Sequence, residues 1–310
     1  MKVIYGLGSI KYKKSAVAIG IFDGIHRGHQ RLIKSMISHA RKLRAKAVVV
    51  TFYPHPSHVL RPEASLPYLI SIDHRLRILE ELGVDVVLVI PFNRRFARID
   101  PSCFIKEILV SQLGVKAVFV GDNFRFGKDR SGDITLFKDL SLKYGYCMRA
   151  VKTLKSQGEI ISSGRLRRII PDGKLKEAQS LLGRCVSVLG QVVHGASRGR
   201  GLGYPTANVQ YQCDVLPPCG VYAVKVIWNK KVFYGMANLG LRPSFKEKNP
   251  KVLLEVHIFD FNRNLYGHQI LVEFIRKVRD EISFSSKEEL IAQIEKDELR
   301  IRRLSLKNQS

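Results

Sequence analysis

The sequence predicts an α/β domain with a parallel sheet, followed by a small antiparallel β-barrel and a closing helix. In the first half, apolar runs of strand length alternate with amphipathic helical patterns, which is typical of parallel sheets with crossover helices. In the second half, short strands are separated by turn signals, which favours a small barrel. A chain of 310 residues is long enough for two domains that each bury a core.

The elements of the first half follow from the spacing of its apolar residues. Strands are expected at residues 16–21, 47–52, 85–90 and 115–121, with helices at 31–44, 73–82 and 101–113 between them. Ligands of such folds bind at the carboxyl ends of the strands. The residues that follow each strand are therefore the candidates for a site.

Two histidines, His26 and His29, lie between the first strand and the first helix. The free N–H groups and the dipole of a helix N-terminus favour a phosphate there. Imidazoles can add hydrogen bonds and, when protonated, charge, and Gly28 leaves room for a ligand to approach the backbone. A histidine in a turn is usually only a turn residue. The position between an apolar strand and an amphipathic helix favours a phosphate site instead.

Beyond the first domain, a turn and a short helix at 171–182, ended by Gly183, are expected to form a linker. Strands follow at 185–194, 221–228, 232–238, 252–260 and 269–276, and a helix at 287–299 closes the chain. Ser286 and Glu289 fit a capping box at its start. Four apolar side chains of this helix are expected to pack on the barrel: Leu290, Ile291, Ile294 and Leu299.

Two stretches of the second half have the composition of a binding site. A glycine-rich loop from Gly195 to Gly203 can wrap phosphates, although it lacks the Walker A ending and is equally consistent with a flexible hairpin. Thr206 and Asn208 follow it and point the same way if extended, and their oxygens suit Mg²⁺. Glu255 alternates with apolar neighbours on a later strand, and a solvated outer face is the usual place for such a residue.

Composition limits the classes of function. Hydrophobic residues make up 45% and charged residues 25%, as in soluble globular proteins. The apolar runs are too short to span a bilayer, the N-terminal stretch lacks a signal-peptide core, and the five scattered cysteines form no CxxC pair. We therefore expect a reduced cytoplasmic protein. The net charge of +25 is spread along the chain, so specific nucleic-acid binding is not favoured, whereas polyphosphate substrates would benefit from the field.

Several motifs resemble one enzyme family. The string GxFDGxHxGH from Gly20 to His29 resembles the HxGH nucleotidyltransferases, and especially the adenylyltransferase module of bacterial FAD synthetases. The segment at 161–167 resembles that family's ISSTxIR, with Gly164 in place of Thr, and Asn123 stands where the family usually has Asp. The loop that ends in PTAN closely resembles the flavokinase signature GRxLGxPTAN. The chain thus resembles the bifunctional riboflavin kinase/FAD synthetases over nearly its whole length.

The resemblance implies a role for each matching residue. In the adenylyltransferase, His26 and His29 would stabilise the charge that develops on the phosphates. In the kinase, Glu255 would point inward and act as general base, Thr206 and Asn208 would hold Mg²⁺, and Arg279 would contact the flavin. The residues that the resemblance assigns to ATP or phosphate are Gly20, Phe22, Asp23, Gly28, Asn123, Ser162, Ser163, Arg167, Gly199, Arg200 and Gly203.

The resulting prediction is an FMN adenylyltransferase at residues 1–170, a linker helix at 171–182 and a riboflavin kinase at 183–305. ATP would convert riboflavin to FMN, and a second ATP would convert FMN to FAD with release of pyrophosphate. Two alternatives stay open. One is a riboflavin kinase with weak or lost adenylyltransferase activity, because of Gly164 and Asn123, and the other is a non-catalytic basic RNA-binding module. We expect no membrane partner, and either a monomer or a weak oligomer.

Overall fold

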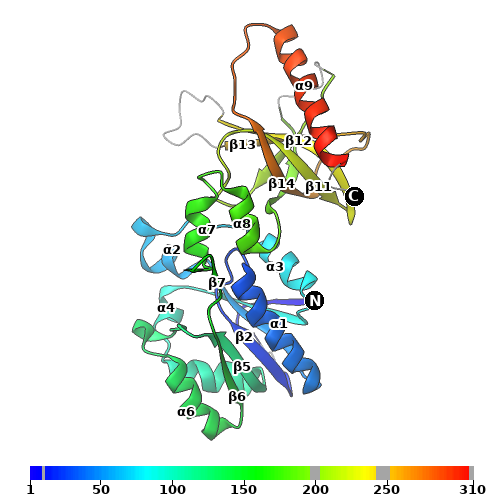
Figure 1. The fold of residues 1–310 in the computed structure, drawn as a ribbon. Coiled ribbons are helices and arrows are strands. Elements are labelled where there is room, and N and C mark those ends of the chain that lie inside the picture. Colours follow the sequence, from blue (N-terminus) through cyan, green and yellow to red (C-terminus); the bar gives the residue numbers. More distant parts are fainter. Residues whose placement is uncertain (9–10, 196–202, 242–251, 307–310) are drawn as a thin grey trace. The chain divides into compact units, whose positions relative to one another are not determined.

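The computed structural model describes residues 1–8, 11–195, 203–241 and 252–306, with the side chains of 304–306 left aside. The chain divides into two compact units, which are described separately (Figure 1). The first unit consists of Met1–Tyr68 and Ile72–Ser163, and the second of Leu69–Ser71 and Gly164–Ser310.

The first unit is built on a parallel six-stranded sheet. In spatial order the strands are β1 (Lys2–Tyr5), β4 (Val86–Pro91), β3 (Lys46–Tyr53), β2 (Ser15–Ile19), β5 (Val115–Gly121) and β6 (Cys147–Val151). The four inner strands are the predicted ones, and β5 has the predicted bounds. The two edge strands were missed, because both are half exposed and neither forms a continuous apolar run.

Helices connect these strands, and α1 packs over β2, β3 and β5 (Figure 1). It buries Leu32, Ile33, Met36 and Ala40, the apolar positions of the predicted helix, but begins at Arg27 instead of residue 31. The predicted helix at 101–113 is a short α-helical turn followed by a π-helical segment. The helical segments are α1 (Arg27–Lys42), α2 (Pro56–Leu60), η1 (Pro62–Ala64), α3 (Ile72–Glu81), α4 (Arg94–Ala97), α5 (Pro101–Cys103), η2 (Phe104–Gln112), η3 (Lys128–Arg130) and α6 (Ile134–Tyr144); β7 (Lys155–Ser156) and β8 (Glu159–Ile160) form a hairpin.

The second unit contains a closed antiparallel barrel in the strand order β10-β13-β12-β11-β14-β9. Two short helices precede it, and α8 ends at Gly183 in the left-handed conformation (φ 70°), as the sequence predicts. The short strand β10 was missed, although Ala207, Val209 and Tyr211 alternate with polar residues as in a half-buried strand. The elements are α7 (Ser163–Ile169), α8 (Leu175–Leu182), β9 (Val186–Val193), β10 (Ala207–Tyr211), β11 (Gly220–Trp228), β12 (Lys231–Leu241), β13 (Val252–Ile258) and β14 (Gln269–Arg279).

The closing helix α9 (Lys287–Leu306) packs on β12 and is longer than predicted. The Glu289 N–H donates to the Ser286 hydroxyl (3.2 Å), as in the predicted capping box, while its carboxylate accepts from Ser285 instead. Ile301 is fully buried, in a cluster of side chains from β11, β12 and β14. The prediction that Leu299 packs on the barrel is wrong, because it is 59% exposed. Two residues before Ile301, it points to the opposite side of the helix.

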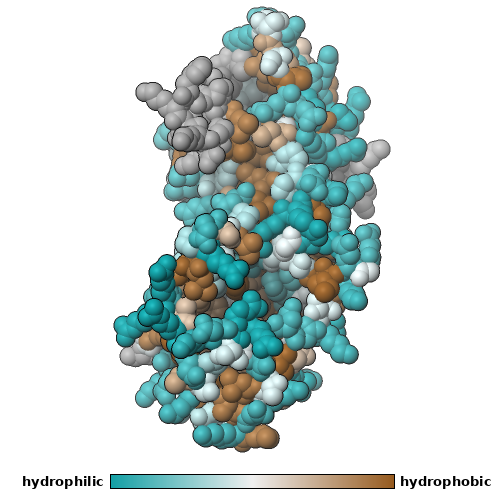
Figure 2. All heavy atoms as spheres, turned by 90° about the vertical axis from the view of Figure 1, so that its left-hand side faces the viewer, coloured by the Kyte–Doolittle hydropathy of each residue, from teal (hydrophilic) through white to brown (hydrophobic). Residues whose placement is uncertain are grey.

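The surface agrees with the composition. Hydrophilic side chains cover most of the face in Figure 2, with apolar side chains in smaller patches between them. None of the helices in the described part of the chain combines the length and apolar character that a membrane crossing needs.

Candidate active sites

The first candidate site is the turn between β2 and α1, where the backbone is strained. Phe22 (φ 54°) and Ile25 (φ 36°) are non-glycine residues with positive φ, and both side chains are buried. Such conformations cost about 1–3 kcal/mol each and persist only where the surroundings impose them. Side chains from three elements bond to this turn: Thr51 Oγ1 donates to the Ile21 carbonyl (3.0 Å), Ser163 Oγ to the Asp23 carbonyl (2.8 Å), and Gln30 Nε2 to the Ile25 carbonyl (2.9 Å).

The two histidines lie together at the start of α1, as the sequence predicts. His26 is the N-cap residue, and its Nδ1 accepts from the His29 N–H at 3.3 Å. The two rings stack with centroids 3.7 Å apart, and Phe22 places its ring edge-on to His29 at 5.3 Å. The earlier start of α1 places His29 in its first turn. His29 therefore presents its ring to the site from a rigid helical position.

The chemical state of His29 follows from these surroundings. Burial lowers the pKa of His29 well below its usual value, and electrostatic interactions with His26 and Arg75 act in the same direction. Its Nδ1 is buried and has no hydrogen-bond partner. His29 is thus an uncharged imidazole at neutral pH, which can act on a ligand by hydrogen bonding but not as a permanent cation.

The two glycines of the motif make room for side chains. A Cβ on Gly20 would lie 2.9 Å from the ring of Phe22, and one on Gly28 would lie 3.1 Å from Nδ1 of His26. Both positions therefore need glycine to let the neighbouring ring pack, in addition to any ligand contact. The role predicted for Gly28, room for a ligand, stays a prediction.

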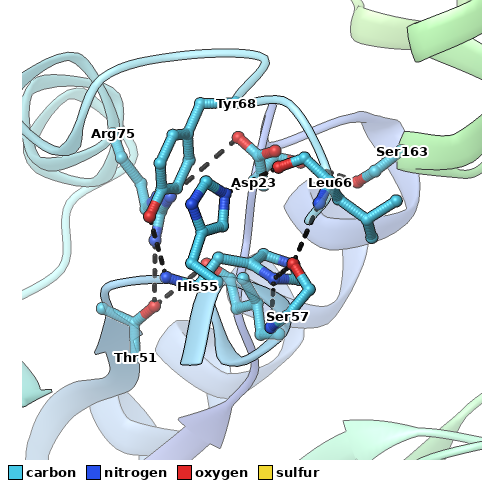
Figure 3. Close-up of polar contacts among 10 residues, drawn as sticks. Asp23, Thr51, His55, Ser57, Leu66, Tyr68, Arg75 and Ser163 are labelled. Atoms are coloured by element: carbon cyan, nitrogen blue, oxygen red, sulfur yellow. Dashed lines mark hydrogen bonds and ion pairs between the residues drawn. The ribbon is translucent and has the colours of Figure 1, made fainter. Parts of the chain in front are cut away.

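A buried polar cluster lies behind the turn (Figure 3). Arg75 of α3 is fully buried, with Nη2 3.9 Å from Asp23 Oδ1 and Nη1 3.4 Å from Thr51 Oγ1. Tyr68 accepts the His55 N–H on its hydroxyl (2.8 Å) at the end of β3. Sequence reasoning missed Arg75. A signal existed, because Arg75 shares the buried face of the predicted helix with Ile78 and Leu79.

The remaining residues predicted for this site lie in different parts of the structure. Ser163 bonds the Asp23 carbonyl, and Ser162 precedes it at the start of α7. Asn123 is exposed in the turn after β5, whereas its neighbour Asp122 accepts a hydrogen bond from the Thr153 N–H. Arg167 belongs to the second unit, as does Arg165, which pairs with Glu177 at 2.6 Å.

A basic groove of about 830 Å³ lies beside α1 in the first unit. Its lining includes six lysines and arginines and one histidine, and no Asp or Glu among the described residues: Arg27, Arg31, Lys34, Lys42, Arg149, Lys152 and His39. Burial lowers the pKa of His39, and the charges of Arg149 and Lys42 act in the same direction. Such a concentration of one sign attracts anions to this face of the unit.

The second candidate site is a row of side chains across neighbouring barrel strands. Glu255 of β13 pairs with Asn208 of β10 on one side and with Asn238 of β12 on the other. Directly paired residues of antiparallel strands point to the same face. The same row continues through Val221 to Arg279 of β14. Register therefore places the predicted base directly beside a predicted magnesium ligand, and the predicted flavin contact lies three strands further along the same row. Asn238 was not singled out from the sequence.

The orientation of Glu255 corrects one expectation. Its neighbours Leu254 and Val256 are 1% exposed and fill the barrel core, so Glu255 lies on the outer face, where it is half-buried. The inward orientation that the resemblance implied is therefore wrong. His257 lies two residues further along on the same face, and its ring forms a 2.8 Å hydrogen bond with the Pro205 carbonyl, which holds the segment that leads to Thr206.

Thr206 and Asn208 present oxygen atoms of the kind that Mg²⁺ prefers. Both are half-buried. A Cβ on Gly195 would lie 2.1 Å from Asn208 Nδ2, so Gly195 leaves the space that this side chain fills. Gly203 is exposed with φ 82°, while Gly199 and Arg200 lie outside the described residues. No cluster of three or more His, Cys, Asp or Glu side chains suited to a metal occurs in the described ranges.

Arg279 is held by the closing helix. Its Nε donates to Asp297 Oδ2 at 2.7 Å, and Asp297 is 4% exposed. Gln293 also donates to this carboxylate. Arg279 thus joins β14 to α9, and any contact with a flavin would be an additional role.

A parallel sheet with a histidine pair at a strand-to-helix turn, joined to a barrel with its own polar row, defines a chain with two separate candidate sites. Family comparison assigns each half. The FAD synthetase model matches residues 9–165, and the riboflavin kinase model matches residues 182–305.

Relatives match over the whole length. The chain is 39% identical to a bifunctional riboflavin kinase/FMN adenylyltransferase of Buchnera aphidicola subsp. Schizaphis graminum, over 96% of each chain. It is 39% identical to that of Escherichia coli K12 over 97% of each, and 39% identical to that of Bacillus subtilis over 92% of this chain and 90% of the relative. The chain belongs to the bifunctional riboflavin kinase/FMN adenylyltransferase family.

A solved structure supports the same arrangement of elements. A crystal structure named as a macrolide-efflux protein from Streptococcus pneumoniae is 32% identical, with a TM-score of 0.82 over 97% of this chain and 99% of that one. The likeness concerns the fold, and the efflux in that name is a statement about the other protein.

Proposed function

We propose that the chain makes FMN from riboflavin and ATP in the barrel, and FAD from FMN and ATP in the parallel-sheet unit. The observation that carries this proposal is the presence of a separate polar site in each unit, at the residues that the two family models cover. We assign the adenylyltransferase to residues 1–170, the linker to 171–182 and the kinase to 183–305. Substrate positioning and charge stabilisation contribute most of the rate in both reactions.

In adenylyl transfer, a phosphate oxygen of FMN attacks the α-phosphorus of ATP, and pyrophosphate leaves. His29, uncharged at neutral pH, donates a hydrogen bond to a phosphate oxygen, and His26 fixes the start of α1 as its cap. The anion gathers at a helix N-terminus, where backbone N–H groups favour it. Ser162, Ser163, Arg167 and Asn123 are the further contacts that we assign to ATP, and the basic groove raises the local concentration of polyphosphate.

In the kinase, Glu255 takes the proton of the ribityl 5′-hydroxyl while that oxygen attacks the γ-phosphorus of ATP. Thr206 and Asn208 would hold Mg²⁺, which neutralises phosphate charge when bound. The pairing of Asn208 with Glu255 supports this assignment, because the two side chains share one face of the barrel. Gly199, Arg200 and Gly203 are the loop residues that we assign to the phosphates, and Arg279 is assigned to the flavin.

The free thiols and the substrates are both compatible with the cytoplasm, where we place the protein. We propose that it is a monomer or a weak oligomer. The described cysteines form no disulfide.

The test is a product assay on the purified chain with riboflavin, ATP and Mg²⁺, in which chromatography separates the flavins. We expect FMN first and FAD later. Absence of both products would contradict the proposal. FMN that accumulates without FAD, even when FMN is supplied directly, would favour the kinase-only alternative that Gly164 and Asn123 suggested.

A further inference from the structure

We propose that Arg75 is a positioning residue of the adenylyltransferase site, and that it holds Asp23 and through it the turn that carries His26 and His29. The inference rests on the proposed function of that turn. Arg75 lies on α3, outside the turn and outside every motif that the resemblance covers.

The guanidinium of Arg75 is poorly satisfied. Arg75 is fully buried, yet its Nε and Nη2 have no hydrogen-bond partner, and its Nη1 makes only a long hydrogen bond of 3.4 Å to Thr51. A buried cation with so few hydrogen bonds is destabilising. A small unit keeps such a residue only where its charge has a use. The charge faces Asp23, which is 2% exposed, at 3.9 Å (Figure 3).

The turn that Arg75 faces is strained. Phe22, Gly24 and Ile25 all have positive φ, so this segment does not hold its shape by local preference. Two connections run from Arg75 to it. One is the charge contact with Asp23, and the other passes through Thr51, which accepts from Arg75 and donates to the Ile21 carbonyl. Arg75 is therefore linked to residues on both sides of Phe22.

The charge of Arg75 also acts on His29. It lowers the pKa of His29, after burial itself and the interaction with His26. Burial lowers the pKa of Arg75 itself, and Asp23 and the hydroxyls of Tyr68 and Tyr53 oppose this effect by favouring the charged guanidinium. Arg75 thus links the geometry of the turn to the uncharged state of the histidine that contacts phosphate.

The test replaces Arg75 in the full chain, with FMN formation in the other unit as an internal control. We expect Arg75→Gln to slow the kcat of FAD synthesis from FMN roughly ten- to hundredfold, on the scale of a lost electrostatic contact, with FMN synthesis within about twofold of wild type. Removal of the cation raises the pKa of His29, so the acid limb of the pH profile for FAD synthesis moves to higher pH. A purely structural role would not move that limb.

Two further variants make the result decisive. Arg77→Gln removes a half-buried arginine of the same helix, paired with Glu81, and should leave both reactions and the pH profile unchanged. Arg75→Lys keeps the charge and should recover most of the FAD synthesis; it also carries the test if Arg75→Gln does not fold. A wild-type rate of FAD synthesis by Arg75→Gln would overturn the inference. Equal losses of FMN and FAD synthesis in both Arg75 variants would also overturn it. A wild-type chain that makes no FAD would refute the proposed function instead.

Discussion

The two units bring their candidate residues together by different means. In the first, a strained turn, a strand end, α3 and the start of α7 meet in a buried cluster around Asp23. In the second, strand register alone aligns Asn208, Glu255 and Asn238 on the half-buried outer face of a barrel. The first site therefore depends on side chains that support the turn from other elements, whereas the second depends on the barrel being formed.

This difference predicts how each site fails. A strained turn loses its geometry when one supporting contact is removed, so distant substitutions should affect FAD synthesis selectively. A register is fixed by many backbone bonds, so the polar row should survive most single substitutions. The kinase should then be sensitive to the reacting groups and to the overall stability of its unit.

The largest effect is expected from His29→Ala. Loss of the imidazole removes a hydrogen bond to the phosphates from a site where such contacts are worth about 10²–10³ in rate. FAD synthesis from FMN should fall by that factor, while FMN synthesis from riboflavin stays near wild type. Steady-state assays of both reactions on one preparation check this. Equal losses in the two reactions would show that the sites are not separate.

Glu255→Gln should affect the opposite reaction. The amide keeps the size of the side chain but cannot accept a proton, and a general base contributes about 10²–10⁴ in rate. FMN synthesis should drop by roughly 10²-fold or more, with unchanged thermal unfolding. A variant that makes FMN at the full rate would show that Glu255 is only a surface residue of β13.

A matched pair of substitutions on α9 tests whether barrel stability limits the kinase. Ile301 is fully buried and Leu299 is 59% exposed on the other side of the same helix. Ile301→Ala should cost about 2–5 kcal/mol, as for a buried aliphatic side chain. Leu299→Ala should stay within about 0.5 kcal/mol. Denaturant unfolding measures both. Similar losses for the two variants would contradict this packing of α9.

The smallest effect is expected in the pH dependence of the stability of the first unit. The pKa of His29 is lower in the folded chain than in the unfolded chain, so the unfolded state binds more protons once the pH falls below about 6.5. Stability is therefore present above that pH and is lost as the pH falls toward the native pKa. His29→Gln should flatten this slope in unfolding experiments between about pH 7 and pH 5. An unchanged slope would contradict the buried, uncharged state of His29.

The sequence predicts best those parts of the fold in which buried residues form continuous apolar runs. The strand β5 is predicted residue for residue because Val115–Gly121 is nearly continuous in buried apolar side chains. The edge strand β6 carries Arg149 among exposed neighbours and gives no such signal. Leu299 was misplaced because the phase of α9 is set by Ile301, beyond the predicted end of the helix.

The same distinction applies to the residues of the two candidate sites. Motif residues such as His26, His29, Asn208 and Glu255 were singled out because they match the family's motifs in type and spacing. The position of Arg75 among apolar residues was a signal of burial, but its contact with Asp23 arises from tertiary packing, and the position of Asn238 beside Glu255 arises from strand register. The face of Glu255 was also misjudged, since alternation along β13 shows a common face but not which face fills the core.

The most direct test of two separate sites is FAD formation by Glu255→Gln when FMN is supplied in place of riboflavin. Independent sites predict wild-type rates of FAD and pyrophosphate release from a variant that can hardly make FMN itself. A loss of FAD synthesis as deep as the loss of FMN synthesis, in a variant that unfolds like wild type, would contradict the account.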